Sequence, residues 1–144
     1  MLFRSPAILL FLAERFPQSP LGFTDLTARG EAYSWLSYIS SGFAEVFWTT
    51  FCETHVFADI ERSPRVLARA RHELDQHLDV LDRHLARRAF LAGDYSVADT
   101  LSTPLLDLLD QLSIDLDAFP RVRSWRDRLR ERPSYKSAWP SDDD

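Results

Sequence analysis

Three histidines, His72, His77 and His84, are the first side chains in this 144-residue sequence that suggest chemistry, because imidazole is a common metal ligand. They lie in a segment with a helical stripe of leucines. On a helix His77 and His84 share a flank but lie about 10 Å apart along the axis, too far to bind one ion. His72 falls on the other flank, and Glu73 stands beside His77 only as an i,i+4 neighbour. The pattern predicts no metal site.

Cys52 is the only cysteine, and the sequence places no His or Lys partner beside it, so we expect a buried, unreactive thiol. A single cysteine forms no internal disulfide, which fits a reducing compartment, and we expect a cytoplasmic protein. The sequence has no apolar run of the roughly 20 residues that span a bilayer. Glu14 and Arg15 follow the apolar run 7–13 without a cleavage pattern, which favours a helix of the fold over a signal peptide. We expect no membrane partner.

One segment carries six arginines, which in another setting would suggest nucleic-acid binding. The arginines are Arg121, Arg123, Arg126, Arg128, Arg130 and Arg132. Asp127 and Glu131 interrupt them, and no aromatic stacking platform accompanies them. The net charge of −5 also argues against an anionic partner. We expect a basic strip on a solvated helix and no nucleic-acid partner.

Aromatic residues are denser between positions 33 and 51 than the core side of one helix needs. They cannot all point the same way, so some must face a partner, a pocket or water. Trp35, Phe43 and Phe47 are assigned to the core. Tyr38 and Trp48 are the candidates for a ligand pocket or an interface.

Ser96 and Asp99 form a predicted capping box at the start of an apolar helix. The Ser96 hydroxyl can accept from the Asp99 backbone N–H, and the Asp99 carboxylate can accept from the Ser96 N–H. Gly93 and Asp94 supply the preceding turn. Asp99 is therefore expected to be a structural residue and not a general base.

The elements that must position these residues are all helical. Apolar residues recur at three- and four-residue steps, and no segment alternates cleanly with period two. A content of 45% hydrophobic and 27% charged residues suits one globular domain. We predict an all-α bundle of five or six helices. Its expected core comprises Trp35, Leu78, Leu81, Leu101, Leu105, Leu108 and Trp125.

An ordered set of motifs identifies a family. The turn Phe-Leu-Ala-Gly-Asp at 90–94 precedes the capping box, Pro-x-Val-x-x-Trp follows at 120–125, and Arg-Pro-x-Tyr-Lys follows at 132–136. This order resembles the C-terminal helical domain of the glutathione S-transferase superfamily. Residues 4–17 are similar to the last helix of that family's thioredoxin-like domain. The resemblance implies a remnant helix at 1–16, a linker at 17–24, the helical domain at 25–139 and an acidic tail at 140–144.

The resemblance also implies site residues. Ser5 matches a serine that binds the γ-glutamyl carboxylate of glutathione through its hydroxyl and backbone N–H at a helix N-terminus. Arg4 stands where the family has Glu or Gln, and a guanidinium would repel the glutamyl ammonium. A plain helix cap is the alternative for Ser5. Tyr38 and Trp48 lie on the helix that lines the family's electrophile pocket. The family's thiol-activating residue precedes this sequence, so no residue is assigned a catalytic role.

Three functions are compatible with these residues. The first is a truncated glutathione-transferase-like protein without independent conjugation. The second is an active transferase whose N-terminal half is missing from this chain or supplied by another, with glutathione as substrate and no cofactor assigned. The third is a non-enzymatic module for protein association or apolar ligands. Residues 7–13 leave no polar helix face, so we expect a homo-oligomer or a partner chain that supplies a thioredoxin-like domain.

Overall fold

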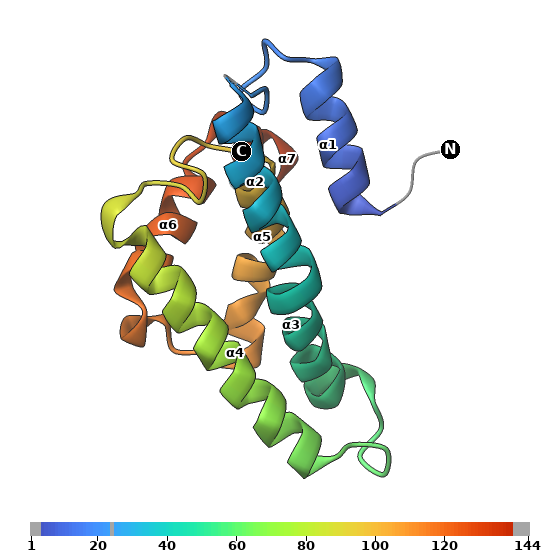
Figure 1. The fold of residues 1–144 in the computed structure, drawn as a ribbon. Helices are drawn as coiled ribbons and strands as arrows, with labels where there is room; N and C mark the ends of the chain where they lie inside the picture. Colours follow the sequence, from blue (N-terminus) through green and yellow to red (C-terminus); the bar gives the residue numbers. More distant parts are fainter. Residues whose placement is uncertain (1–3, 24, 140–144) are drawn as a thin grey trace.

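The computed structural model describes residues 4–23 and 25–139, and within these ranges every regular element is a helix (Figure 1). Apart from helices, the described residues hold only two isolated bridges, in the turn at 90–94. The prediction of an all-α bundle is confirmed. Residues 1–3, Thr24 and the predicted acidic tail at 140–144 lie outside the described residues.

The first helices are α1 (Ser5–Arg15) and α2 (Leu26–Tyr38). Pro6 lies in the first turn of α1, where its missing N–H costs nothing. Asp25 caps α2, with its carboxylate accepting the N–H of Thr27 at 2.7 Å and of Ala28 at 2.9 Å. The turn between the two helices needs Gly22, because an added Cβ would come within 2.0 Å of the Pro17 carbonyl oxygen.

The helix that begins with α2 continues through two wide turns. The π-helical segment Ile39–Phe43 leads into α3 (Ala44–Phe51), and a second π segment, Cys52–Val56, ends the run at Phe57. Figure 1 shows this run as one long rod. α2 packs mainly against α5, and α3 packs mainly against α4.

The longest helix, α4 (Pro64–His84), follows the tip of the rod and returns along α3. Ser63 caps it, with the Ser63 hydroxyl accepting the Val66 N–H at 3.4 Å. Buried Glu53 accepts the Ser63 N–H at 2.7 Å, which ties the second π segment to the start of α4. One stripe of α4 is buried, and it consists of Ala70, Leu74, Leu78, Leu81 and Asp82.

The remaining helices are α5 (Val97–Leu108), α6 (Pro120–Arg130) and α7 (Pro133–Ala138). Pro104 lies inside α5, and Pro120 and Pro133 begin α6 and α7. Short 3-10 turns at Leu85–Arg87, Leu109–Leu112 and Leu116–Ala118 connect these elements. No helix among the described residues combines the length and apolar character that a bilayer crossing requires.

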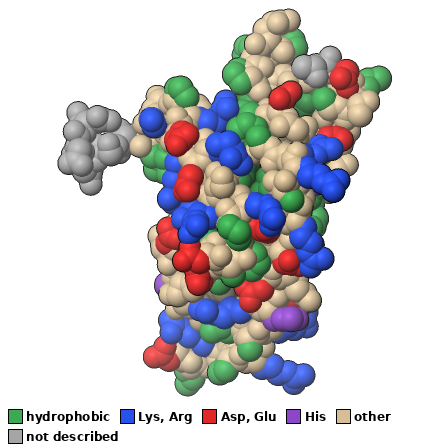
Figure 2. Space-filling view, turned by 90° about the vertical axis from the view of Figure 1, so that its left-hand side faces the viewer, with side chains coloured by type: hydrophobic (Ala, Val, Ile, Leu, Met, Phe, Trp, Pro, Cys, Tyr) green, Lys and Arg blue, Asp and Glu red, His purple; other side chains and the backbone are tan. Residues whose placement is uncertain are grey.

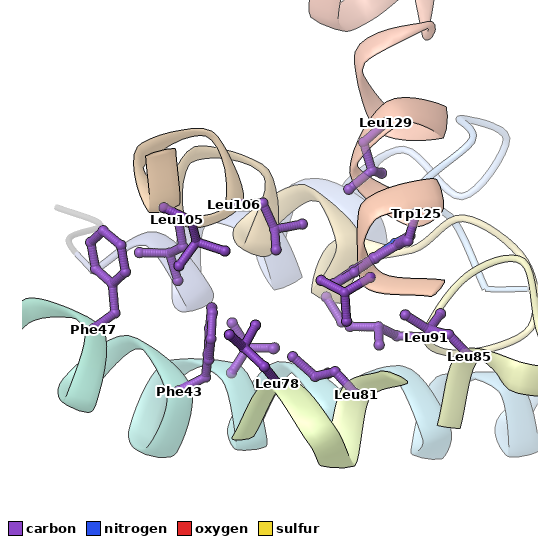
Figure 3. Packing of buried hydrophobic residues seen from close by; sticks show 14 of the residues in the cluster. Phe43, Phe47, Leu78, Leu81, Leu85, Leu91, Leu105, Leu106, Trp125 and Leu129 are labelled. Atoms are coloured by element: carbon purple, nitrogen blue, oxygen red, sulfur yellow. The ribbon is translucent and has the colours of Figure 1, made fainter. Parts of the chain in front are cut away.

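The core lies between the rod, α4, α5 and α6, with Trp125 fully buried among leucines (Figure 3). Phe43 and Phe47 are fully buried, as expected from the sequence. The core list is wrong in part, because three of its members are only half-buried. Trp35 packs at a tilt against His84, with ring centroids 4.1 Å apart, and edge-on against Tyr38. The other two are Leu101 and Leu108.

Candidate functional site

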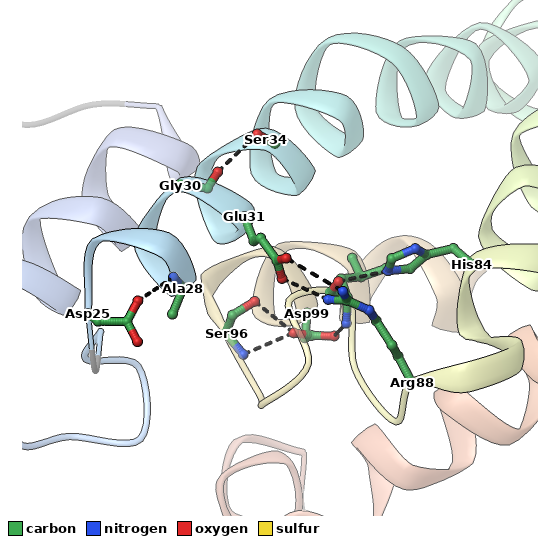
Figure 4. Close-up of polar contacts among 10 residues, drawn as sticks. Asp25, Ala28, Gly30, Glu31, Ser34, His84, Arg88, Ser96 and Asp99 are labelled. Atoms are coloured by element: carbon green, nitrogen blue, oxygen red, sulfur yellow. Dashed lines mark hydrogen bonds and ion pairs between the residues drawn. The ribbon is translucent and has the colours of Figure 1, made fainter.

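The capping box forms and extends into a larger network around Asp99 (Figure 4). The Asp99 Oδ2 accepts the Ser96 N–H at 2.9 Å and the Ser96 hydroxyl at 2.8 Å. The Asp99 Oδ1 accepts the Leu91 N–H and the Trp125 indole N–H, each at 3.0 Å. One carboxylate therefore joins the 90–96 turn, the start of α5 and the centre of α6.

Asp99 has no solvent exposure, and burial raises the pKa of its carboxyl although the donors from Leu91, Ser96 and Trp125 act in the opposite direction. A general base would need access to a substrate proton. Both oxygens of the Asp99 carboxylate accept hydrogen bonds from protein donors. The structural role expected from the sequence is the one that the geometry supports.

A groove of about 780 Å³ lies where α1, α5 and α7 meet. Its size is typical of a small-molecule site. Ile8, Leu9, Leu21 and Leu101 contribute apolar walls. The aromatic side chains Tyr95, Tyr135 and Trp139 line the end nearest α7, where Tyr135 and Trp139 stack with centroids 5.4 Å apart. α1 supplies one wall, so the groove depends on this helix being held in place.

A polar clamp holds α1 against α2. The Glu14 carboxylate accepts the Tyr33 hydroxyl at 2.6 Å and also pairs with the Arg29 guanidinium. The Tyr33 hydroxyl in turn accepts from Arg29 Nε at 3.0 Å. α1 also contacts α5. Sequence analysis did not predict this triad, because Glu14 lies on α1 whereas Arg29 and Tyr33 lie on α2.

Ser5 lines the groove and is exposed. It is the first residue of α1, and the cap position belongs to Arg4, which has a positive φ of 72° and makes no side-chain capping bond. The plain cap expected for Ser5 as the alternative is therefore wrong. The start of α1 lies beside the groove, and a helix N-terminus suits an anionic group such as a carboxylate. The guanidinium of the adjacent Arg4 would still repel the ammonium group of a glutamyl ligand.

Arg132 is the cationic side chain of the groove. Its guanidinium lies 3.4 Å from the centroid of the Tyr95 ring, and its buried Nε has no hydrogen-bond partner among the described residues. The two phenols of the groove, Tyr135 and Tyr95, both form hydrogen bonds. The Tyr135 hydroxyl donates to Asp107 at 2.9 Å, and Thr100 donates to the Tyr95 hydroxyl at 2.9 Å.

Tyr38 and Trp48 lie outside the groove. The Tyr38 hydroxyl and His77 Nδ1 are 2.7 Å apart, joining α2 to α4, and burial raises the pKa of Tyr38 and lowers that of His77. Gly42 permits this approach, because an added Cβ would lie 3.0 Å from the His77 ring. Trp48 is 47% exposed and packs edge-on against Phe47 and Phe51. The two candidates therefore do not share one pocket with Ser5.

The other sequence candidates make no joint site. His72 is exposed, and His84 Nε2 lies 2.8 Å from the Leu91 carbonyl oxygen. Among residues 4–23 and 25–139, no group of three or more His, Cys, Asp or Glu side chains could hold a metal ion. Cys52 is half-buried and not fully buried as the sequence predicts, and it is the first residue of the second π segment.

The arginines of α6 are largely neutralised within the chain. Arg121, Arg123, Arg126 and Arg130 pair with Asp82, Asp117, Asp110 and Asp107, respectively. Figure 2, which views the molecule from the side where α6 lies in Figure 1, shows basic and acidic side chains interspersed. Buried Asp82 also accepts the Arg121 N–H at 2.7 Å and the Val122 N–H at 3.2 Å, so α4 caps α6. Four of the six arginines in the basic strip thus form ion pairs within the chain.

Comparison with known proteins accounts for this architecture. Residues 39–133 match the family model described as "Glutathione S-transferase, C-terminal domain". The chain belongs to this family. The resemblance inferred from the motifs is confirmed, and the family model includes the capping box and the Trp125 helix.

Two proteins of Escherichia coli (strain K12) are similar over most of the chain. The disulfide-bond oxidoreductase YfcG is 30% identical over 139 residues, covering 95% of this chain and 62% of YfcG. The disulfide-bond oxidoreductase YghU is 32% identical over 146 residues, covering 93% of this chain and 48% of YghU. The chain thus spans only part of the length of these curated relatives.

Solved structures show the same fold. A sphingomonad glutathione S-transferase in complex with glutathione is 31% identical with a TM-score of 0.81, covering 95% of this chain and 66% of that chain. Ure2p in complex with glutathione has a TM-score of 0.86 at 22% identity, covering 96% of this chain and 69% of that chain. The second likeness concerns the fold alone.

Proposed function

We propose that residues 1–144 form the helical part of a glutathione-transferase-like protein and do not conjugate glutathione by themselves. The groove between α1, α5 and α7 carries this proposal. It is largely apolar, and it lies against the helix that resembles the end of a thioredoxin-like domain. We expect a thioredoxin-like half, in the same protein or in a partner chain, to cover it. A homo-oligomer is the alternative occupant that the experiment must distinguish.

The chemistry of the groove supports the absence of independent conjugation. A group that stabilises the glutathione thiolate must have a free hydroxyl or thiol to donate. The Tyr135 proton is directed to Asp107, and burial together with that carboxylate raises the pKa of Tyr135. Ser5 stands at a helix N-terminus and suits a carboxylate better than a sulfur. Neither Tyr135 nor Ser5 is therefore assigned as the thiol activator.

Together with a thioredoxin-like half, the chain would form a protein that uses glutathione as a substrate. The similarity to two disulfide-bond oxidoreductases and to glutathione-bound structures supports glutathione as the substrate of the whole protein. Ser5 at the edge of the groove would then bind the γ-glutamyl carboxylate. A single cysteine and the likeness to this family support a cytoplasmic location.

The test is a conjugation assay with a dinitrobenzene electrophile. We expect the 144-residue chain alone to give the uncatalysed rate. The same chain mixed with the separate thioredoxin-like domain of a glutathione transferase should form a hetero-complex in sedimentation analysis. Turnover by the chain alone that is lost in Ser5→Ala or Tyr38→Phe would contradict the proposal. If homo-oligomers persist in the presence of the added domain, the groove is covered by a second copy of this chain and not by a thioredoxin-like domain.

A further inference from the structure

A second hollow, of about 420 Å³, lies between the end of α4 and the start of α6 and shares no lining residue with the groove. Leu85, Ala86, Ala89 and Pro120 contribute the apolar part of its lining. Four arginines also line the hollow, and no acidic residue is among the lining side chains. The four are Arg87, Arg88, Arg121 and Arg128, and the Ser124 hydroxyl lies among them.

Only half of this positive charge is compensated. Arg88 pairs with Glu31 at 2.7 Å, and Arg121 pairs with Asp82 at 2.7 Å. Arg87 and Arg128 have no carboxylate within ion-pair distance in the part of the chain that the structure describes. The other arginines of α6 up to position 130 all have such a partner, so the charge imbalance is localised at this hollow.

Arg128 is held in place by contacts other than charge. Its Nε donates to the Ala89 carbonyl oxygen at 3.2 Å, one Nη donates to the Ser124 hydroxyl at 3.2 Å, and its guanidinium lies 5.9 Å from the Phe90 ring centroid. These contacts fix the group at the rim before any ligand arrives, which lowers the entropy cost of binding. The amides at the start of α6 are occupied by Asp82, so the guanidinium groups carry the positive field.

We propose that this hollow binds a phosphate group, either free phosphate or the phosphate of a small organic molecule. Guanidinium groups match phosphate oxygens in geometry and can bind them in pairs. Two uncompensated guanidinium groups balance the two charges of a phosphate monoester dianion. The apolar side chains in the lining and the volume of about 420 Å³ leave room for an organic group beside the phosphate. This site is independent of the groove and of the function proposed for it.

Calorimetric titration of the full chain tests the proposal, with inorganic phosphate, AMP and adenosine as probes and ionic strength held constant with chloride. We expect saturable binding of phosphate and of AMP, and none of adenosine. Tighter binding of AMP than of phosphate would identify an organic phosphate as the natural source. Equal affinity would identify free phosphate. Equal binding of AMP and adenosine, or no saturable binding of either phosphate probe, would overturn the proposal.

Variants locate the binding. Arg87→Glu should weaken phosphate binding at least tenfold, and this side chain is exposed and makes no recorded contact that folding needs. Arg65→Glu is the matched control, because Arg65 is exposed at the opposite end of α4, about 30 Å away by the helix rise. Arg65→Glu should bind as the parent does. Equal losses in the two variants would show a response to net charge alone and would refute a site at the hollow.

Discussion

The Asp99 carboxylate accepts the indole N–H of Trp125 at 3.0 Å, although the two residues are 26 positions apart in the chain. Asp99 lies in the first turn of α5, and Trp125 lies at the centre of α6. The same carboxylate closes the capping box of α5. A residue that begins one helix thereby fixes the position of another, and the 90–96 turn is held by the same atoms.

Replacing Asp99 by alanine should destabilise the fold by about 3 kcal/mol, because the Leu91 and Trp125 N–H groups would lose their acceptor inside the protein. Ser96→Ala should cost less, about 1 kcal/mol, which is typical of a lost helix cap. Chemical denaturation of both variants measures the difference. The exposed neighbour change Asp94→Ala is the control and should stay within about 0.5 kcal/mol of the parent. Identical denaturation curves for Asp99→Ala and Asp94→Ala would contradict this role.

Asp82 should also be a stability determinant, since its buried carboxylate accepts two backbone N–H groups of α6 and pairs with Arg121. We expect Asp82→Ala to cost about 2 kcal/mol in unfolding free energy, from the buried donors left without an acceptor. Asp79→Ala removes an exposed ion pair with Arg83 on the same helix and should cost no more than about 0.5 kcal/mol. Equal melting temperatures for Asp82→Ala and Asp79→Ala would contradict the prediction.

His77 should make the stability depend on pH. Burial lowers its pKa in the folded protein, so the neutral imidazole is favoured there. A lowered folded pKa means that its contribution is present above the unfolded value of about 6.5 and is lost as pH falls through the folded pKa. The melting temperature of the parent should therefore fall between pH 7.5 and pH 5.

His77→Asn, which keeps an acceptor for the Tyr38 hydroxyl, should show a smaller fall over that range. His72→Asn changes an exposed histidine of the same helix and should behave as the parent does. An equal fall in all three proteins would assign the pH dependence to other groups.

The apolar face of α1 should drive association of the isolated chain. Ile8, Phe11 and Leu12 are 37%, 49% and 38% exposed, and Leu9 lines the groove. We expect light scattering at micromolar concentration to detect oligomers, and Leu9→Gln with Phe11→Gln to reduce them. Ile60→Gln is the control, because Ile60 is 95% exposed at the distant tip between the second π segment and α4. A monomeric parent whose size the α1 changes leave unaltered would contradict this.

The sequence predicted the parts of the fold that depend on local signals. The capping residue Ser96 and the leucine stripe of α4 each act within one turn or one helix face, so spacing alone reveals them. The contacts between helices were not predictable in this way. Asp82 has the sequence appearance of any surface carboxylate on a charged helix, and its burial follows only from where the start of α6 lies.

The sequence predicted the place of only some residues of the candidate site. Ser5 was placed correctly at the start of α1, and it does line a groove. Arg132 was grouped with the basic strip, although it turns from that strip toward Tyr95. Tyr38 and Trp48 were grouped because they are aromatic neighbours in sequence. The π segment between them changes the direction in which each points, and no simple periodicity reports such a segment.

The π segment Ile39–Phe43 gives the long rod one residue more than an α-helix of the same course would hold. Each residue of an α-helix turns the chain by about 100°, so the extra residue rotates the buried side of α3 away from that of α2. α2 packs mainly against α5 and α3 mainly against α4, and Tyr38 at the end of α2 also reaches His77 of α4. The packing of the rod therefore depends on the number of residues in this π segment more than on their identity. Deleting Ser40 would rotate Phe47 out of the core, although no core side chain is changed.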